Sequence, residues 1–128
     1  MNKILINLQK NCNNAVVILN SEYEDLHKRV SINASMSDSA LQLSNYASPV
    51  FKEKLEQISK NSDTCYLVIK NIDQVSVSMQ LRFLGLIKDR EICGYSLPRN
   101  VIVVLTVSDK QNLKNIDSTL YHLCVDAI

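Results

Sequence analysis

The chain has 128 residues, a length typical of one domain, and 46% of them are hydrophobic, which is enough to build a buried core. Its 14 basic and 13 acidic residues almost cancel, which argues against the basic excess of a dedicated nucleic-acid binder. No run of about 18 apolar residues and no secretory leader pattern occurs, so we predict no membrane span and a cytoplasmic location.

The four cysteines indicate neither a metal centre nor a disulfide framework. None forms a CxxC pair, and none has a histidine at zinc-finger spacing. Cys65 and Cys124 lie in apolar runs and are expected to pack as small hydrophobic side chains. His122 with Cys124 is the nearest approach to a metal pair, and two ligands do not make a site. We therefore predict free thiols, no metal and no cofactor.

The first part of the chain is predicted to contain an N-terminal arm or helix and two strands. The arm or helix covers residues 1–14. Residues 15–19 are continuously apolar, as expected for a strand buried on both faces. Ser21 is expected to cap a short helix over residues 22–27. Residues 30–34 alternate apolar and polar side chains, which is typical of a strand near a sheet edge.

Residues 36–61 are predicted to be helical, with Ser37 or Asp38 as the N-cap. Pro49 interrupts this region, so we expect two helices or one kinked helix. The second half carries an apolar stripe at helical spacing, which indicates a face packed on the core. The stripe consists of Val50, Phe51, Leu55 and Ile58.

Two apolar, β-branched runs, residues 66–69 and 101–105, carry the clearest fold signal. Between them lies an amphipathic segment, residues 77–91, with Ser76 or Ser78 as its N-cap. A helix between two buried strands is typical of a crossover that joins parallel strands. The predicted core face of this helix consists of Leu81, Leu84, Ile87, Met79 and Phe83.

The remaining segments complete an alternation of strands and helices. A turn is expected over residues 94–100, a short helical stretch over 110–115, a last helix over 117–122 and a final short strand within 123–128. Such alternation predicts an α/β fold with a mostly parallel, five-stranded sheet covered on both faces, which is a three-layer α/β/α sandwich.

The order of these elements from residue 15 onward resembles the nucleotide-binding core of AAA+ ATPases. Residues 67–73 read Leu-Val-Ile-Lys-Asn-Ile-Asp and look like the Walker B strand of that family. Residues 80–100 look like the helix and turn that follow, and residues 101–108 look like the sensor 1 strand. The resemblance implies one AAA+-like domain over residues 1–128.

The resemblance also implies a strand order, 2-3-4-1-5, in which the strand at residues 15–19 lies between the strand at 101–105 and the C-terminal strand. Another open sheet of the flavodoxin type is the rival fold. The neighbours of the first strand distinguish the two.

The phosphate-binding loop of the family is absent from the sequence. Such a loop reads GxxxxGK[ST], because its glycines let backbone N–H groups surround the phosphates. The chain has only two glycines, Gly85 and Gly94, and neither is followed by lysine. After the first strand, residues 20–25 read Asn-Ser-Glu-Tyr-Glu-Asp, and their acidic groups would repel phosphate.

The Walker B positions are also replaced, which makes this a degenerate Walker B. The metal-binding Asp of the family aligns with Lys70, and the Glu that activates water aligns with Asn71. A lysine cannot hold magnesium, and an amide is a poor base. Asp73 follows two residues later, either as a stray ligand or, as we favour, as a cap on the next turn.

Thr106 and Ser108 stand where the family places its sensor 1 polar residue, although such hydroxyls also satisfy local backbone groups. The position of the arginine finger, residues 120–123, reads Leu-Tyr-His-Leu. The small helical lid has no counterpart up to Ile128. A scaffold that lacks these elements implies a pseudo-ATPase that is not an enzyme.

We therefore expect a non-catalytic domain that acts through a protein partner or self-association, and we do not expect ATP to bind. An alternative is a nucleotide-binding or ATPase-related protein with a non-standard site at the carboxyl ends of the strands. That possible cleft would contain Asn20, Ser21, Asn71, Asp73, Thr106, Ser108 and Asp109.

A third reading is a weak nucleic-acid-binding module, which the small net charge disfavours. Its basic residues would be Lys70, Arg82, Lys88, Arg90 and Arg99. His27 and His122 are the only imidazoles, and both are expected to pack or to face water.

Overall fold

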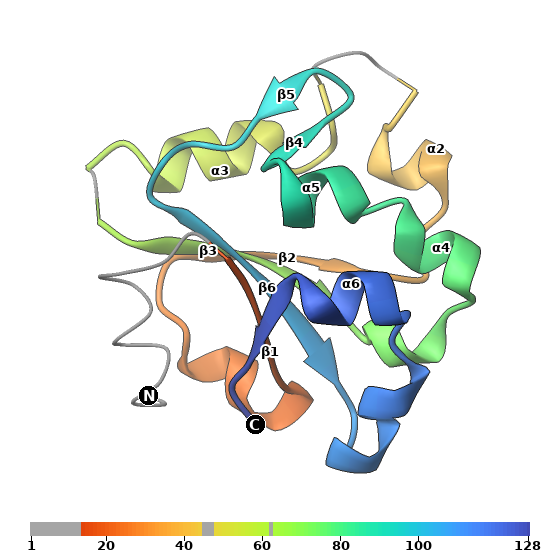
Figure 1. Cartoon of the computed structure of the whole chain (residues 1–128). Helices are drawn as coiled ribbons and strands as arrows, with labels where there is room; N and C mark the ends of the chain where they lie inside the picture. The colour runs from red at the N-terminus through yellow and green to blue at the C-terminus, as the bar shows by residue number, and fades with distance from the viewer. Residues whose placement is uncertain (1–13, 45–47, 62) are drawn as a thin grey trace.

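The computed structural model describes residues 14–44, 48–61 and 63–128 of the chain (Figure 1). Nearly all of the arm or helix predicted for residues 1–14 therefore lies outside the described residues. No helix in these described ranges is long and apolar enough to cross a membrane.

A five-stranded parallel sheet lies at the centre of the molecule. Its strands lie side by side in the order β2-β3-β6-β1-β7, and each of the four pairings is parallel. The predicted α/β class with a parallel five-stranded sheet is confirmed. The neighbours of β1 in the sheet are β6 and β7. The strands are β1 (Ala15–Leu19), β2 (Arg29–Asn33), β3 (Cys65–Lys70), β6 (Val101–Val107) and β7 (Cys124–Asp126).

The central strands β3 and β6 are buried on both faces because nearly all of their residues are apolar, the exceptions being Lys70 and Thr106 near their carboxyl ends. Alternate side chains of each strand enter two different core clusters, one on each face of the sheet. In β3, Leu67 and Ile69 enter the larger cluster, whereas Tyr66 and Val68 enter the smaller one. The burial of β2 alternates along the strand, and β2 lies at the sheet edge as predicted.

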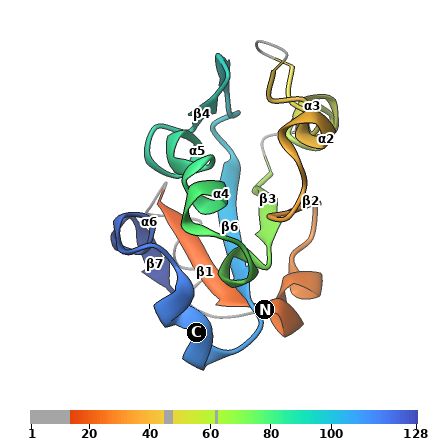
Figure 2. The same cartoon turned by 90° about the vertical axis from the view of Figure 1, so that its right-hand side faces the viewer.

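Among the described residues, five short α-helices and three 3-10 helices connect the strands. The larger core cluster includes side chains of α2, α3, α5 and α6 and of residues that flank α4. Helices α2, α3 and α5 lie above the sheet in Figure 1. The 3-10 helix η1 lies on the opposite face, where Tyr23 and Leu26 pack on the smaller cluster (Figures 1 and 2). The elements are α2 (Asp38–Leu41), α3 (Lys52–Ile58), α4 (Val77–Leu81), α5 (Leu84–Lys88), α6 (Ser118–His122), η1 (Asn20–Asp25), η2 (Ile72–Gln74) and η3 (Lys110–Asn115).

Helix starts were predicted better than helix lengths. Ser37 caps α2 and Ser76 caps α4, each by accepting a hydrogen bond from a backbone N–H three residues later. Pro49 separates α2 from α3, as expected. The predicted cap at Ser21 is wrong, because η1 begins at Asn20, one residue before Ser21, and no side chain caps it.

The predicted single helix over residues 77–91 is wrong, because the structure divides it into α4 and α5. The buried face differs accordingly: Phe83 and Ile87 are buried as predicted, but Leu81 is exposed and Gln80 is buried. Three hydrogen bonds satisfy the Gln80 amide, two donated to carbonyl oxygens and one accepted from a backbone N–H. A buried polar side chain is stable when its donors and acceptors are matched in this way.

A small antiparallel hairpin replaces the turn predicted for residues 94–100. Its strands are β4 (Glu91–Ile92) and β5 (Tyr95–Ser96). The reversal between them passes through positive φ angles at Cys93 (50°) and Gly94 (82°), which glycine adopts without strain.

The hairpin packs so closely on α5 that Gly85 leaves no room for a side chain. A β-carbon at this position would lie 2.6 Å from the backbone oxygen of Glu91. We expect Gly85→Ala to lower the free energy of unfolding by about 1–2 kcal/mol, although alanine is the better helix former, because the backbone must shift. Urea unfolding tests this, with the exposed Lys88→Ala as control. A Gly85→Ala protein more stable than the parent would contradict the prediction.

Candidate functional site

Three polar side chains meet where β1, β3 and β6 end. Thr106 Oγ1 donates to Asn20 Oδ1, and Asn20 Nδ2 donates to Asn71 Oδ1 at 2.6 Å. The backbone N–H of Asn71 donates to Thr106 Oγ1 at 3.0 Å. Asn71 has a left-handed backbone (φ 62°), a conformation that asparagine tolerates better than most residues. Each of the three side chains therefore forms a hydrogen bond with another residue of the set, and we name this set the asparagine–threonine net.

A second group of polar side chains lies next to this net, between η2 and the end of β6. Ser108 Oγ donates to Asp73 Oδ2 at 2.8 Å and accepts from Gln74 Nε2 and Asn112 Nδ2. Gln74 Nε2 also contacts Asp73 Oδ2 at 2.8 Å. Asp73 is buried, and its Oδ1 has no hydrogen-bond partner among the described residues. Asp73 thus acts as an acceptor that fixes the start of the segment after β6.

Lys70, which aligns with the metal-binding Asp of the Walker B pattern, is the last residue of β3, and its side chain packs against Tyr23 of η1. Its Nζ donates to the Tyr23 hydroxyl at 3.3 Å and lies 4.6 Å from the centroid of the Tyr23 ring. The guanidinium carbon of Arg29 lies 5.2 Å from the centroid of the same ring. An ammonium group here repels a divalent cation, so this position carries the charge opposite to that of a Walker B aspartate.

The structure brings together five of the predicted cleft residues and separates two. Asn20, Asn71 and Thr106 form one net, and Asp73 with Ser108 forms the other. Ser21 is exposed and makes no side-chain hydrogen bond to another described residue. Asp109 turns outward and caps η3 by accepting from the N–H of Gln111 at 2.9 Å.

Neither histidine joins the nets. His27 is exposed, and His122 Nδ1 lies 2.7 Å from the carbonyl oxygen of Ser118 in the same helix. In the part of the chain that the structure describes, no three His, Cys, Asp or Glu side chains gather at one point. The nets contain hydroxyl, amide and carboxylate groups, and none of their hydroxyls is paired with an imidazole base.

Three of the basic residues considered for nucleic-acid binding are engaged inside the fold. Lys70 lies on Tyr23, and Arg82 donates to the carbonyl oxygens of three residues. Arg90 donates to Pro98 O at 2.8 Å, and burial lowers the pKa of its guanidinium. These side chains stabilise the domain and do not form a free basic surface.

The cysteine prediction is confirmed for Cys65, which is a buried strand residue. Cys65, Cys93 and Cys124 are free thiols, and Cys12 lies outside the described residues. Burial raises the pKa of Cys65, and it raises that of Cys124 to about 12. Thiols held protonated in this way are poor nucleophiles at neutral pH.

Sequence reasoning missed Tyr23, Gln74 and Asn112 as members of these groups. Each stands within a few residues of a strand end, in the segment after β1, β3 or β6. The available signal was position, since the carboxyl ends of parallel strands share one edge of the sheet. The chain matches no protein-family model. No curated protein matches its sequence closely enough to count as a relative.

Proposed function

We propose that this chain is a non-catalytic AAA+-like domain, a pseudo-ATPase that acts by binding a protein partner. The sheet supports the proposal. When the two strands of the separate hairpin are left out of the count, the five sheet strands run in the order 2-3-4-1-5. In the proposed three-layer α/β/α sandwich, the layer that contains η1 is the thinner of the two outer layers.

The asparagine–threonine net is the observation that carries the proposal. It lies where an AAA+ protein would hold nucleotide, and its side chains are bonded to one another. A ligand would have to break these bonds and replace each of them, which costs binding free energy. Lys70 beside the net disfavours magnesium, and no glycine-rich loop follows β1.

Exposed apolar side chains support protein binding. Val77 and Leu81 stand one turn apart on α4 and are 49% and 39% exposed, and Val50 is 41% exposed at the start of α3. Val77 and Leu81 lie on the same face of α4, and contact surfaces are built from exposed apolar side chains of this kind when they form a contiguous patch.

Calorimetric titration with ATP and with ADP, each with and without Mg²⁺, tests the non-catalytic assignment. We expect no binding heat at millimolar nucleotide, because the chain lacks a phosphate-binding loop. A micromolar dissociation constant for either nucleotide would contradict the proposal.

The double variant Lys70→Asp/Asn71→Glu restores the two acidic groups of a Walker B strand. We expect no ATP hydrolysis above the buffer blank, because carboxylates without a phosphate loop cannot position the γ-phosphate. Phosphate release measured over hours checks this, with the parent chain as control. Measurable ATP turnover in the double variant would contradict the assignment as a pseudo-ATPase.

One observation favours the alternative of a non-standard site. Asp73 Oδ1 is buried without a hydrogen-bond partner among the described residues, and a buried unpaired carboxylate oxygen is an acceptor that a cation or ligand can satisfy. The same titration distinguishes the two functions. If nucleotide binds, substitution of Asn20, Ser21, Asp73 and Thr106 would locate the site.

A further inference from the structure

A groove of about 650 Å³ runs along the free edge of β2. Figure 2 shows β2 at one edge of the sheet, with α2 and α3 beside it on the helical face. α3 packs over β2 and forms the outer wall of the groove. The lining residues are Lys28, Arg29, Val30, Ser31, Ile32, Met36, Val50, Phe51 and Lys54.

The backbone of β2 presents unpaired groups to this groove. Tyr66 N–H donates to Lys28 O at 3.0 Å, and Ala34 N–H donates to Lys70 O at 2.8 Å. In a parallel ladder every second residue faces the neighbouring strand, so the residues at 28, 30, 32 and 34 face β3. The N–H and C=O groups of Arg29 and Ser31 therefore point away from β3, where no described strand pairs with them.

The edge lacks three of the features that can block strand addition. Natural edge strands are protected by proline, bulges or inward-pointing charges. β2 contains no proline, and its five residues pair with β3 without a bulge. The side chains on the helical face are Val30 and Ile32, and both are apolar and buried.

The two ends of the groove differ in chemistry. α3 begins beside the end of β2 and runs back toward the start of β3 (Figure 1). Met36 follows β2, and the N–H of Val50 donates to the carbonyl oxygen of Leu41 in α2, so this apolar pair lies toward the end of the strand. Lys28 directly precedes β2 and lies at its start. Lys54, in the first turn of α3, adds a second cation to the same groove. The groove lining contains no acidic residue.

The two lysines are available to a ligand. Lys54 is exposed and has no ion-pair partner among the described residues. Lys28 pairs with Asp63 at the surface, where the side chains are 38% and 65% exposed, and such a pair is weak and exchangeable. Arg29 is different, because its guanidinium donates to the carbonyl oxygens of Glu24 and Leu26.

We propose that the free edge of β2 binds an extended segment of a partner protein as an added strand. An acidic residue of the segment lies beside Lys28 and Lys54, and an apolar residue packs on Val50. This inference rests on the proposed protein-binding function and names its site and partner chemistry. Strand addition supplies affinity through main-chain hydrogen bonds, and the flanking side chains supply specificity.

Charge complementarity favours a different protein over a second copy of this chain. The β2 strand of a second copy reads Arg-Val-Ser-Ile-Asn and is preceded by Lys28, so it brings no acidic residue to the two lysines. A segment with aspartate or glutamate at one end and alternating β-branched residues along its length fits both ends of the groove.

Two fluorescein-labelled peptides with alternating valine and threonine test the proposal, one with an aspartate pair at its N-terminus and one with the pair at its C-terminus. Fluorescence anisotropy with the full chain should show saturable micromolar binding of one peptide. If the peptide with N-terminal aspartates binds, the added strand is parallel to β2. If the peptide with C-terminal aspartates binds, the added strand is antiparallel to β2. A lysine-for-aspartate peptide is the control and should bind about tenfold more weakly.

Two pairs of variants locate the binding edge. Ser31→Pro removes an N–H that points away from β3, so the sheet keeps its ladder while peptide affinity falls about tenfold; Ser31→Thr is its control. Lys54→Glu should weaken the aspartate peptide about fivefold, whereas the exposed Lys60→Glu should not. In the parent chain, the amide protons of Arg29 and Ser31 should gain exchange protection on binding.

The outcomes separate this inference from the proposed function. If no peptide binds, or if binding is unchanged by both Ser31→Pro and Lys54→Glu, the strand-addition site is wrong even when nucleotide fails to bind. Dimerisation that Ser31→Pro abolishes would overturn the choice of a foreign partner. Micromolar nucleotide binding would instead overturn the proposed function. Unchanged exchange at Arg29 and Ser31 in a saturated complex also refutes the site, independently of any variant.

Discussion

The Arg82→Met variant is expected to lose about 3 kcal/mol of unfolding free energy, because three backbone carbonyl oxygens lose their donor. Arg82 Nη2 donates to Ala34 O, and Nη1 donates to Met36 O, both at 2.8 Å. Its Nε donates to Met79 O at 3.0 Å, and Nη1 also pairs with Asp38. The guanidinium therefore holds α4 to the chain that leaves β2.

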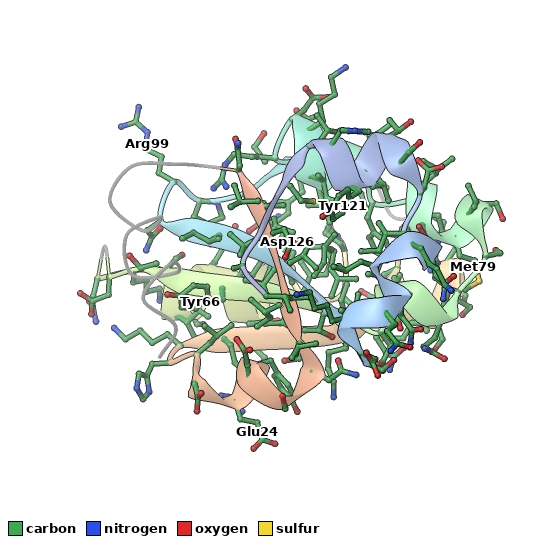
Figure 3. All side chains as sticks on the ribbon, turned by 60° about the horizontal axis from the view of Figure 1, so that its bottom comes forward. Glu24, Tyr66, Met79, Arg99, Tyr121 and Asp126 are labelled. Atoms are coloured by element: carbon green, nitrogen blue, oxygen red, sulfur yellow. The ribbon has the colours of Figure 1, made fainter. Side chains whose placement is uncertain are left out.

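Two other variants show whether the geometry of the guanidinium matters. Arg82→Lys keeps the charge but has no planar set of donors, so it should recover less than half of the lost stability. Arg99 projects into solvent in Figure 3, and Arg99→Met should change stability by less than about 0.5 kcal/mol. Urea unfolding measures all three. A loss below about 1 kcal/mol in Arg82→Met would contradict the assigned role.

Arg82→Met should also affect the groove along β2. Met36 lines the groove, and Arg82 donates to its carbonyl oxygen and to that of Ala34. Arg82 also donates to the carboxylate of Asp38, on the other side of Met36. Loss of the guanidinium frees this wall, so peptide affinity at the β2 edge should fall together with stability. Arg82 thus connects the core of the domain to the surface proposed to bind a partner.

The strands of this fold could be predicted because the information is local. Val101 to Leu105 and Cys65 to Ile69 are unbroken apolar runs, and strands in the middle of a parallel sheet bury both faces. The hairpin at residues 91–96 could not be predicted in the same way. Each of its strands has two residues, and close contact with Gly85 helps to place it, which is a tertiary effect.

The candidate site could be predicted in position but not in its bonding. The carboxyl ends of parallel strands share one edge, so Asn20, Asn71 and Thr106 were expected to lie near one another. The sequence does not show that they bond to one another, because that depends on the left-handed backbone of Asn71. The groove at β2 depends on how α3 packs, and the sequence indicated only an edge strand, through the alternation of apolar and polar residues over 30–34.

The Tyr66→Phe variant is expected to be more stable than the parent, increasingly so at alkaline pH. Tyr66 is a buried residue on the face that carries η1 (Figure 3), and its hydroxyl has no partner among the described residues. Removing an unpaired buried hydroxyl should add about 1 kcal/mol at pH 7. Burial, and to a smaller extent Cys65, raises the pKa of Tyr66 from 10.0 to about 12.

The sign of the pH effect follows from that shift. Below pH 10 the phenol is protonated in both the folded and the unfolded chain, so its contribution is constant. Between pH 10 and 12 only the unfolded chain releases the proton, and the parent loses up to about 2.7 kcal/mol that Tyr66→Phe retains. Tyr95 has an unpaired hydroxyl and a pKa of about 12 as well, and it lies in the other core cluster, so Tyr95→Phe should add independently.

Tyr121→Phe is the matched control, because the Tyr121 hydroxyl donates to Asp126 at 2.8 Å at the surface (Figure 3). Removing this bond should lower stability slightly at pH 7, by at most about 1 kcal/mol, so the same substitution has opposite signs at the two tyrosines. Urea unfolding under reducing conditions at pH 7, 9 and 11 measures both effects. A Tyr66→Phe curve parallel to that of the parent between pH 9 and 11 would show that the phenol ionises as readily in the folded chain as in the unfolded one.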